Sequence, residues 1–131
     1  MDLGLAGRTV IVTGAGKGIG LAAVRALLDE GALVVAGSRS ANVDTRALEG
    51  RDGFTFVEVD LGTADGPQRL VDAIDGEIHA VVNNVGSAPV RPAGFASITD
   101  EEWLGTFTLN VLAAVRLTRA AIPRMTAAAR S

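Results

Sequence analysis

Short apolar runs alternate along this chain with longer segments of helical pattern. The apolar runs are rich in β-branched residues and have the length of ordinary strands. The predicted strands are residues 9–12, 33–37, 54–59 and 78–84. The predicted helices are residues 18–31, 42–50 (a short helix or a turn), 66–76 and 101–125. This alternation predicts an α/β fold in which helices cover both faces of a parallel sheet.

Local signals mark the ends of these helices. Gly31 should stop the first one, and Pro67 fits the first turn of the third. Thr99 and Glu102 have the spacing of a capping box at the start of the last helix, and Pro123 should kink or weaken its last turn. The predicted core-facing residues of the first helix are Ile19, Ala22, Ala23, Ala26 and Leu27.

Size and composition favour one globular domain over residues 1–131, with 48% hydrophobic and 21% charged residues. The net charge of −3 argues against nucleic-acid and membrane-surface partners, which do not attract an acidic protein. There is no cysteine and His79 is the only histidine, so we expect no metal site of those ligands. No apolar stretch has the length of a signal core or of a membrane span, so we expect a cytoplasmic protein.

The segment TGAGKGIG, residues 13–20, joins the first predicted strand to the first predicted helix. Gly14 would permit a tight turn, Gly18 would let a pyrophosphate approach the backbone, and Gly20 would let the helix pack closely. A P-loop does not fit, because Gly18 rather than Ser or Thr follows Lys17. From this loop alone, nucleotide binding and a plain glycine-rich turn are equally good interpretations. The Pro- and Gly-containing segment 86–98 follows the fourth predicted strand, so it should lie at the same, ligand-binding edge of the sheet.

Further motifs occur in order along the chain. NNVG at residues 83–86 is similar to an N-N-A-G signature with Val85 in place of alanine, Asp60 is followed by Leu61, and Asn110 lies inside the last helix. Together with TGAGKGIG, these motifs resemble the short-chain dehydrogenase/reductase family. The resemblance covers the whole chain but only the first half of the family's domain. It implies a Rossmann-like sheet of strand order 3-2-1-4 that ends before the fifth strand.

The resemblance also implies roles for particular residues. Thr13 would brace the glycine turn, and Asn83 would tie strands together. Asp60 would accept a hydrogen bond from the adenine, and Leu61 would supply backbone contacts. By themselves, Asp60 would be interpreted as a surface carboxylate, and Asn83 and Asn84 as turn residues. The remaining cofactor-binding candidates are Gly14, Gly16, Lys17, Gly18, Ile19 and Gly20 at the pyrophosphate and Asn83, Asn84, Val85 and Gly86 near the adenosine ribose.

The end of the second strand indicates which dinucleotide is preferred. Where an NAD-binding chain has an acidic residue that takes the ribose hydroxyls, this chain has neutral Ser38 followed by Arg39. An arginine can bind a 2′-phosphate through charge-assisted hydrogen bonds, and Lys17 can add charge. We therefore predict NADP rather than NAD as cofactor. The alternative is that Arg39 is a solvated loop residue.

The catalytic relay that the family resemblance implies consists of Asn, Ser, Tyr and Lys, with tyrosine as general acid/base. This chain has no tyrosine, and Lys17 is its only lysine. Asn110 alone matches the relay, so we expect a vestigial catalytic residue in a chain that is inactive alone. Three functions remain open: a module that binds the dinucleotide, one half of a split enzyme, and a regulatory protein.

An association surface is also predicted. The fourth strand would be an apolar sheet edge without a neighbour, and such edges favour association. We therefore expect a homo-oligomer that uses this edge and the apolar face of the last helix. The candidate residues of that face are Trp103, Phe107, Leu109, Leu112 and Val115.

Overall fold

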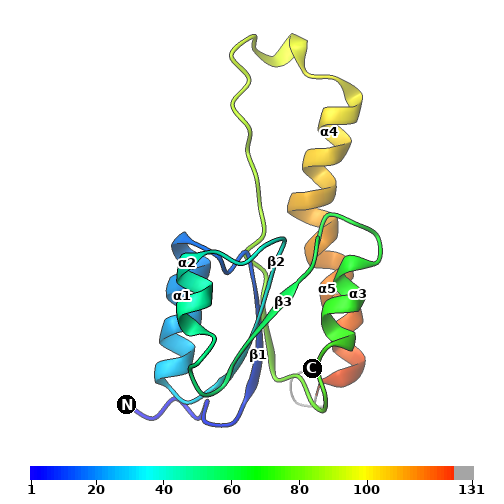
Figure 1. Cartoon of the computed structure of the whole chain (residues 1–131). Helices are drawn as coiled ribbons and strands as arrows, with labels where there is room; N and C mark the ends of the chain where they lie inside the picture. Colours follow the sequence, from blue (N-terminus) through cyan, green and yellow to red (C-terminus); the bar gives the residue numbers. More distant parts are fainter. Residues whose placement is uncertain (126–131) are drawn as a thin grey trace.

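The computed structural model describes residues 1–125, which build one parallel sheet flanked by helices (Figure 1). Its four strands lie in the order β3-β2-β1-β4 and all pairs are parallel, so the predicted order 3-2-1-4 is confirmed. The strands are β1 (Thr9–Thr13), β2 (Leu33–Ser38), β3 (Phe54–Glu58) and β4 (Ala80–Val82). β4 is shorter than the predicted residues 78–84, because only three of its residues pair with β1.

The helices cover both faces of this sheet, as predicted. The α-helices are α1 (Gly18–Asp29), α2 (Val43–Leu48), α3 (Gly66–Asp72), α4 (Asp100–Phe107) and α5 (Ala113–Ala121). Short 3-10 turns η1 (Phe95–Ser97) and η3 (Ile122–Arg124) and a π turn η2 (Thr108–Leu112) complete them. In Figure 1, α1 and α2 lie on one side of the sheet and α3 and α5 on the other.

Two apolar clusters form the core, one on each face of the sheet. Val10 and Val12 of β1 pack with Val24 of α1 in the first cluster. Ile11, between them in sequence, packs with Leu70 of α3 and Leu117 of α5 in the second. Successive side chains of a strand point to opposite faces, and here both faces are covered, so β1 is a continuous apolar run.

The predicted apolar face of α1 is wrong for most of its residues, although Leu27 is partly buried and packs against the core. Its buried residues are Gly20, Leu21, Val24 and Leu28, whereas Ile19 is 80% exposed. The reason is at the start of the helix, where Gly20 lies against the carbonyl oxygen of Gly14 with no room for a side chain. That contact turns the positions four and eight residues later, Val24 and Leu28, toward the sheet.

The last helical segment begins with the predicted capping box. The Thr99 hydroxyl accepts a hydrogen bond from the Glu102 N–H at 3.2 Å, and the Glu102 carboxylate accepts one from the Thr99 N–H at 2.9 Å. The bond from the Thr99 backbone is the main cause that lowers the pKa of Glu102. The ionised Glu102 carboxylate therefore stabilises the folded chain at pH values above the ordinary pKa of a glutamate. This stabilisation is lost as the pH falls through the lowered pKa of Glu102.

Beyond that cap the helix is not uniform. The π turn η2 separates α4 from α5, and Pro123 lies in η3, which confirms the predicted change in the last turn. α4 and the segment 83–98 extend past the sheet in Figure 1. An ion pair at 3.3 Å between Arg91 and Glu102, and an edge-on contact of the Phe95 and Trp103 rings, connect that segment to α4.

β4 forms one margin of the described sheet. The side chains of Ala80, Val81 and Val82 are only half-buried, unlike those of β1 and β2. Among the described residues, the only pairing beyond β4 is an isolated parallel bridge between Ile78 and Met125. The Arg124 side chain fixes the chain there, because it donates hydrogen bonds to the carbonyl oxygens of Val71 near the end of α3 and of Ile74 and Gly76 in the α3–β4 connection. No helix within residues 1–125 is long and apolar enough to cross a membrane.

Candidate functional site

The glycine loop between β1 and α1 has two kinds of glycine. A Cβ on Gly14 would lie 2.5 Å from the Asn84 carbonyl oxygen, and one on Gly20 would collide with the Gly14 carbonyl oxygen. A Cβ on Gly18, by contrast, would meet no atom within 4 Å. Gly14 and Gly18 also have φ angles of +60° and +55°, which favour glycine. Gly14 and Gly20 therefore let the loop pack, while Gly18 leaves its backbone open to a ligand.

Asn84 holds this loop against the end of β4. Its side-chain amide donates to the Gly14 carbonyl oxygen at 3.2 Å, and its backbone N–H donates to the Thr13 hydroxyl at 3.0 Å. The buried Thr13 hydroxyl in turn donates to the Val82 carbonyl oxygen at 3.4 Å. The structure thus brings the NNVG segment and the glycine loop into direct contact, although about 70 residues separate them in sequence.

Asn83 points elsewhere. Its amide donates to the Thr118 hydroxyl of α5 at 3.2 Å, so in the described residues it connects the sheet to a helix. That Asn83 also ties strands together stays a prediction. The two neighbouring asparagines thus bond to different elements, Asn83 to α5 and Asn84 to the glycine loop.

Asp60 and Leu61 follow β3 at the same edge of the sheet. The Asp60 Oδ1 accepts a hydrogen bond from the Gly62 N–H at 2.9 Å, which closes a tight turn, and the residue is exposed. The Leu61 side chain is 4% exposed and packs in the core with α5. Only the backbone of Leu61 is thus placed to meet a ligand, whereas Asp60 can offer its other carboxylate oxygen.

The end of β2 presents a cation and no acid. Ser38 is the last residue of β2, and Arg39 directly after it is exposed. No acidic side chain of residues 1–125 lies within 4.0 Å of the Arg39 guanidinium. Lys17, at the N-cap of α1, is exposed as well. This corner of the site therefore has positive charge available for an anionic group.

Asn110 lies in the π turn and anchors the segment that follows β4. Its Oδ1 accepts from the Ser87 N–H at 3.0 Å, and its Nδ2 donates to the carbonyl oxygens of Ser87 and Thr106, both at 2.8 Å. A Cβ on Gly86 would lie 2.8 Å from the Asn110 Oδ1, so Gly86 permits this close approach. The Asn110 side chain therefore holds the loop that follows β4 against the helix.

A small hollow lies between these elements. Its cavity volume is about 40 Å³, enough for a water molecule or two but not for a substrate. Polar and apolar residues of β1, the ends of β3 and β4, the π turn and α5 line it, among them Thr13, Leu61, Asn83, Asn110 and Leu117.

Comparison with known proteins assigns the chain to a family. The family model described as short chain dehydrogenase matches residues 8–131. The chain belongs to the short-chain dehydrogenase family. This confirms the resemblance inferred from the four motifs.

Individual members of the short-chain dehydrogenase family show how far the similarity extends. Human L-xylulose reductase is 40% identical over 91% of this chain and 48% of its own length. The structure of L-sorbose reductase from Gluconobacter frateurii, complexed with NADPH and L-sorbose, is 32% identical with a TM-score of 0.85 and covers 94% of this chain and 49% of that one. NADH-dependent reductase A1-R′, complexed with NAD, is 30% identical with a TM-score of 0.85, over 95% of this chain and 54% of that one. The chain spans about half the length of the curated relatives it matches.

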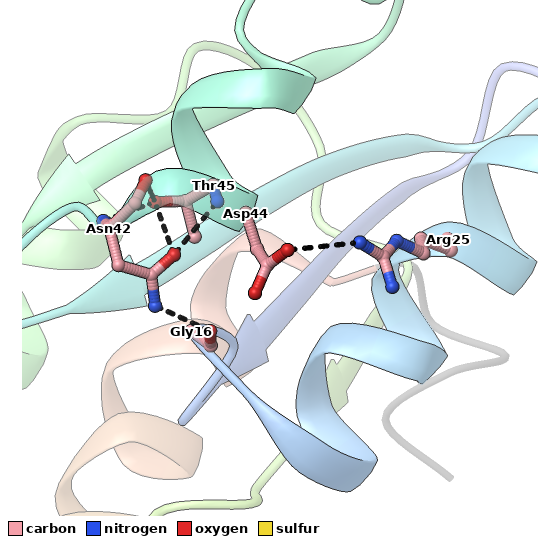
Figure 2. Close-up of polar contacts among 5 residues, drawn as sticks. All are labelled: Gly16, Arg25, Asn42, Asp44 and Thr45. Carbon is pink, nitrogen blue, oxygen red and sulfur yellow. Dashed lines mark hydrogen bonds and ion pairs between the residues drawn. The ribbon is translucent and has the colours of Figure 1, made fainter.

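One residue of this short-chain dehydrogenase chain was not a candidate from the sequence. The Asn42 side-chain amide donates to the Gly16 carbonyl oxygen at 2.6 Å, so it connects α2 to the glycine loop (Figure 2). Asn42 and Thr45 also form the capping box of α2. An asparagine at the start of a predicted helix is a recognisable N-cap signal, but nothing in the sequence indicates its long-range bond to Gly16.

Proposed function

We propose that this chain binds a nicotinamide dinucleotide at the carboxyl ends of its strands, and NADP(H) in preference to NAD(H). The observation that carries the proposal is Gly18, whose backbone is open between the closely packed Gly14 and Gly20. In open parallel sheets, ligands bind beyond the carboxyl ends of the strands. The glycine loop lies at the carboxyl end of β1. When bound, the dinucleotide would supply hydride chemistry.

The residues present fit such a ligand. Backbone N–H groups of Gly18, Ile19 and Gly20 begin the 12-residue helix α1, whose N-terminus favours a pyrophosphate. Asp60 would accept from the adenine amino group, with the Leu61 backbone beside it. The segment Asn83–Gly86 would form the floor near the adenosine ribose, because Asn84 holds it against the glycine loop.

Charge at the end of β2 supports NADP over NAD. The 2′-phosphate is the part that distinguishes the two cofactors, and Arg39 offers it a planar guanidinium without a described acidic partner. Ser38 is neutral where a carboxylate would repel that phosphate. One of the related structures binds NADPH and another NAD, so the preference rests on Ser38 and Arg39 of this chain.

We further propose that the chain alone does not transfer hydride to a carbonyl. A chain without tyrosine has no phenol to act as the general acid/base of the family's relay. Asn110 is the one relay residue it carries, and its side chain is already engaged by Ser87 and Thr106.

Titration with NADPH tests the binding proposal. Because a ligand that binds only the folded state stabilises it, NADPH at a hundred times its dissociation constant should add about 2.7 kcal/mol to the free energy of unfolding. The measurements are nicotinamide fluorescence and the melting temperature, with NADH in a parallel titration. A melting temperature that neither cofactor shifts would refute binding, and steady carbonyl reduction by the pure chain would refute the inactivity.

A second candidate function is the cofactor-binding half of an active oxidoreductase whose serine, tyrosine and lysine come from a continuation of the chain or from a second polypeptide. The anchored loop around Asn110 and the half-length match to the relatives favour it. A Ser…Tyr-x-x-x-Lys pattern in the coding sequence after residue 131, or activity restored by a separate chain that carries it, would distinguish this function from a binding module.

Self-association is a separate proposal. Large apolar side chains of the last helix are exposed, including Trp103 at 51%, Phe107 at 54% and Val115 at 42%, and β4 lies at the sheet margin. We expect a homo-oligomer at micromolar concentration and a shift to monomer in Val115→Glu. Light scattering after gel filtration measures both, and Val43→Glu on α2, whose side chain is 82% exposed, is the matched control. A monomeric wild-type chain would contradict the proposal.

A further inference from the structure

Asn42 uses the two ends of its side-chain amide in different places (Figure 2). Its Oδ1 accepts a hydrogen bond from the Thr45 N–H at 2.9 Å and thereby caps α2. Its Nδ2 donates to the Gly16 carbonyl oxygen at 2.6 Å, across to the glycine loop. The same residue therefore fixes the start of α2 and the distance from that start to the loop.

The bond from Asn42 to Gly16 restricts the position of the short connection between β2 and α2. At one end, Ser38 is held in the sheet, since its carbonyl oxygen accepts the Val59 N–H at 2.8 Å. At the other end, Asn42 is held on Gly16. Arg39 lies between these two fixed points, one residue after Ser38. The position of Arg39 relative to the glycine loop is thus limited from both sides.

Gly16 is suited to this contact. A Cβ at Gly16 would lie 3.2 Å from the Asn42 Nδ2, tighter than an ordinary contact, and 3.7 Å from the Ser38 hydroxyl oxygen. Gly16 therefore leaves space for Asn42 and Ser38 to close over the loop.

The loop has a second anchor that does not involve α2. Asn84 holds the Gly14 carbonyl oxygen from the β4 side, and Thr13 supports the same contact. Gly14 is next to the turn that leads to Gly18, whereas Gly16 faces Ser38 and Asn42. Loss of Asn42 should consequently leave the pyrophosphate end of the loop in place and release the Arg39 connection.

From this arrangement we infer that Asn42 is a positioning residue for cofactor selectivity, which holds the Arg39 connection where a 2′-phosphate would bind. The inference rests on the proposed binding of NADP(H). Asn42 would act through Arg39 and the glycine loop. Its loss should therefore lower the affinity for NADP(H) and leave the affinity for NAD(H) nearly unchanged.

The variant Asn42→Ser tests this inference. Serine still caps α2 but is too short to reach the Gly16 carbonyl oxygen, so the fold should be retained. Loss of one hydrogen bond that positions a charged contact should raise the NADPH dissociation constant about five- to tenfold. The NADH dissociation constant should change by less than about twofold. Fluorescence titration of purified chain with each cofactor gives both values.

A matched control lies two residues further on. Asp44→Asn removes the ion pair of Asp44 with Arg25, 3.5 Å apart on the exposed surface, but leaves the Asn42 contacts intact. This variant should bind both cofactors like the wild type, because exposed ion pairs contribute little to stability. Asn42→Asp keeps the cap, places an acceptor against the Gly16 carbonyl oxygen and adds a negative charge near the proposed 2′-phosphate, so for both reasons it should weaken NADPH binding further than serine does.

The outcomes separate the two proposals. If the wild type binds neither cofactor, the proposed function fails and this inference with it. If the wild type binds NADPH but Asn42→Ser weakens NADPH and NADH by the same factor, or weakens neither, only the selectivity role of Asn42 is refuted. A selective loss of NADPH affinity in the uncharged Asn42→Ser, with an unchanged melting temperature, supports it.

Discussion

Alanine at Gly18 and alanine at Gly20 should damage this protein in opposite ways. Gly20→Ala would place a Cβ against the Gly14 carbonyl oxygen and 2.6 Å from the Asn84 Nδ2, so the loop and α1 would have to separate. We expect a loss of about 3 kcal/mol in the free energy of unfolding, typical of an overpacked site. Gly18→Ala meets open space and should cost only about 1–2 kcal/mol for its left-handed backbone.

Gly18→Ala, which costs less stability than Gly20→Ala, should have a direct effect on cofactor binding. The methyl group at residue 18 would occupy the space through which a pyrophosphate reaches the backbone, so Gly18→Ala should weaken NADPH binding at least tenfold, about 1.4 kcal/mol. Urea unfolding measures the first effect and NADPH titration the second. Gly50→Ala is the control, because a Cβ at Gly50 would meet no atom within 4 Å and Gly50 lies after the C-terminal end of α2, outside the glycine loop. A Gly18→Ala chain with full NADPH affinity would show that the loop is only a packing turn.

Arg39→Gln should lower the affinity for NADPH by about 10- to 100-fold and leave the NADH affinity unchanged. A hydrogen bond to a charged group contributes roughly 1.5–3 kcal/mol, and glutamine keeps a polar side chain without the charge. The same fluorescence titrations measure it. The difference between the two cofactors should also shrink in the wild type as salt rises, because Arg39 is exposed and its field is screened.

The matched control for Arg39→Gln is Arg8→Gln. Arg8 is also exposed and, within residues 1–125, also lacks an acidic partner within 4.0 Å. It precedes β1, however, and so lies at the amino ends of the strands, away from the proposed cofactor site. It should change neither affinity. Equal losses in Arg8→Gln and Arg39→Gln would indicate general charge attraction, and no loss in either would mean that Arg39 is a solvated loop residue.

The sequence predicted the architecture well because the fold is parallel. Strands covered on both faces are continuous β-branched runs, as at residues 9–12, and such runs are easy to distinguish from the helical segments between them. The capping box of Thr99 and Glu102 is equally local, and the structure contains it. Features set by neighbours in sequence were therefore within reach of sequence reasoning.

Features set by distant contacts were not. The buried face of α1 depends on how Gly20 meets Gly14, and the average apolar pattern around Ile19 indicated a different face. The bond from Asn42 to Gly16 joins residues 26 positions apart and leaves no periodic signal. The π turn contains Asn110, whose side chain bonds to Ser87, and Ser87 belongs to a loop that no helix pattern describes.

The two asparagine anchors also have a consequence for folding order. One joins the glycine loop to a residue 26 positions later, and the other to a residue 70 positions later. Contacts of such long sequence separation form late, after the entropy of closing the intervening chain has been lost. The loop emerges early in synthesis, yet it cannot reach its final shape until β4 has docked beside β1. Cofactor affinity should therefore report complete assembly of the sheet, and a nascent chain that ends before residue 84 should not have it.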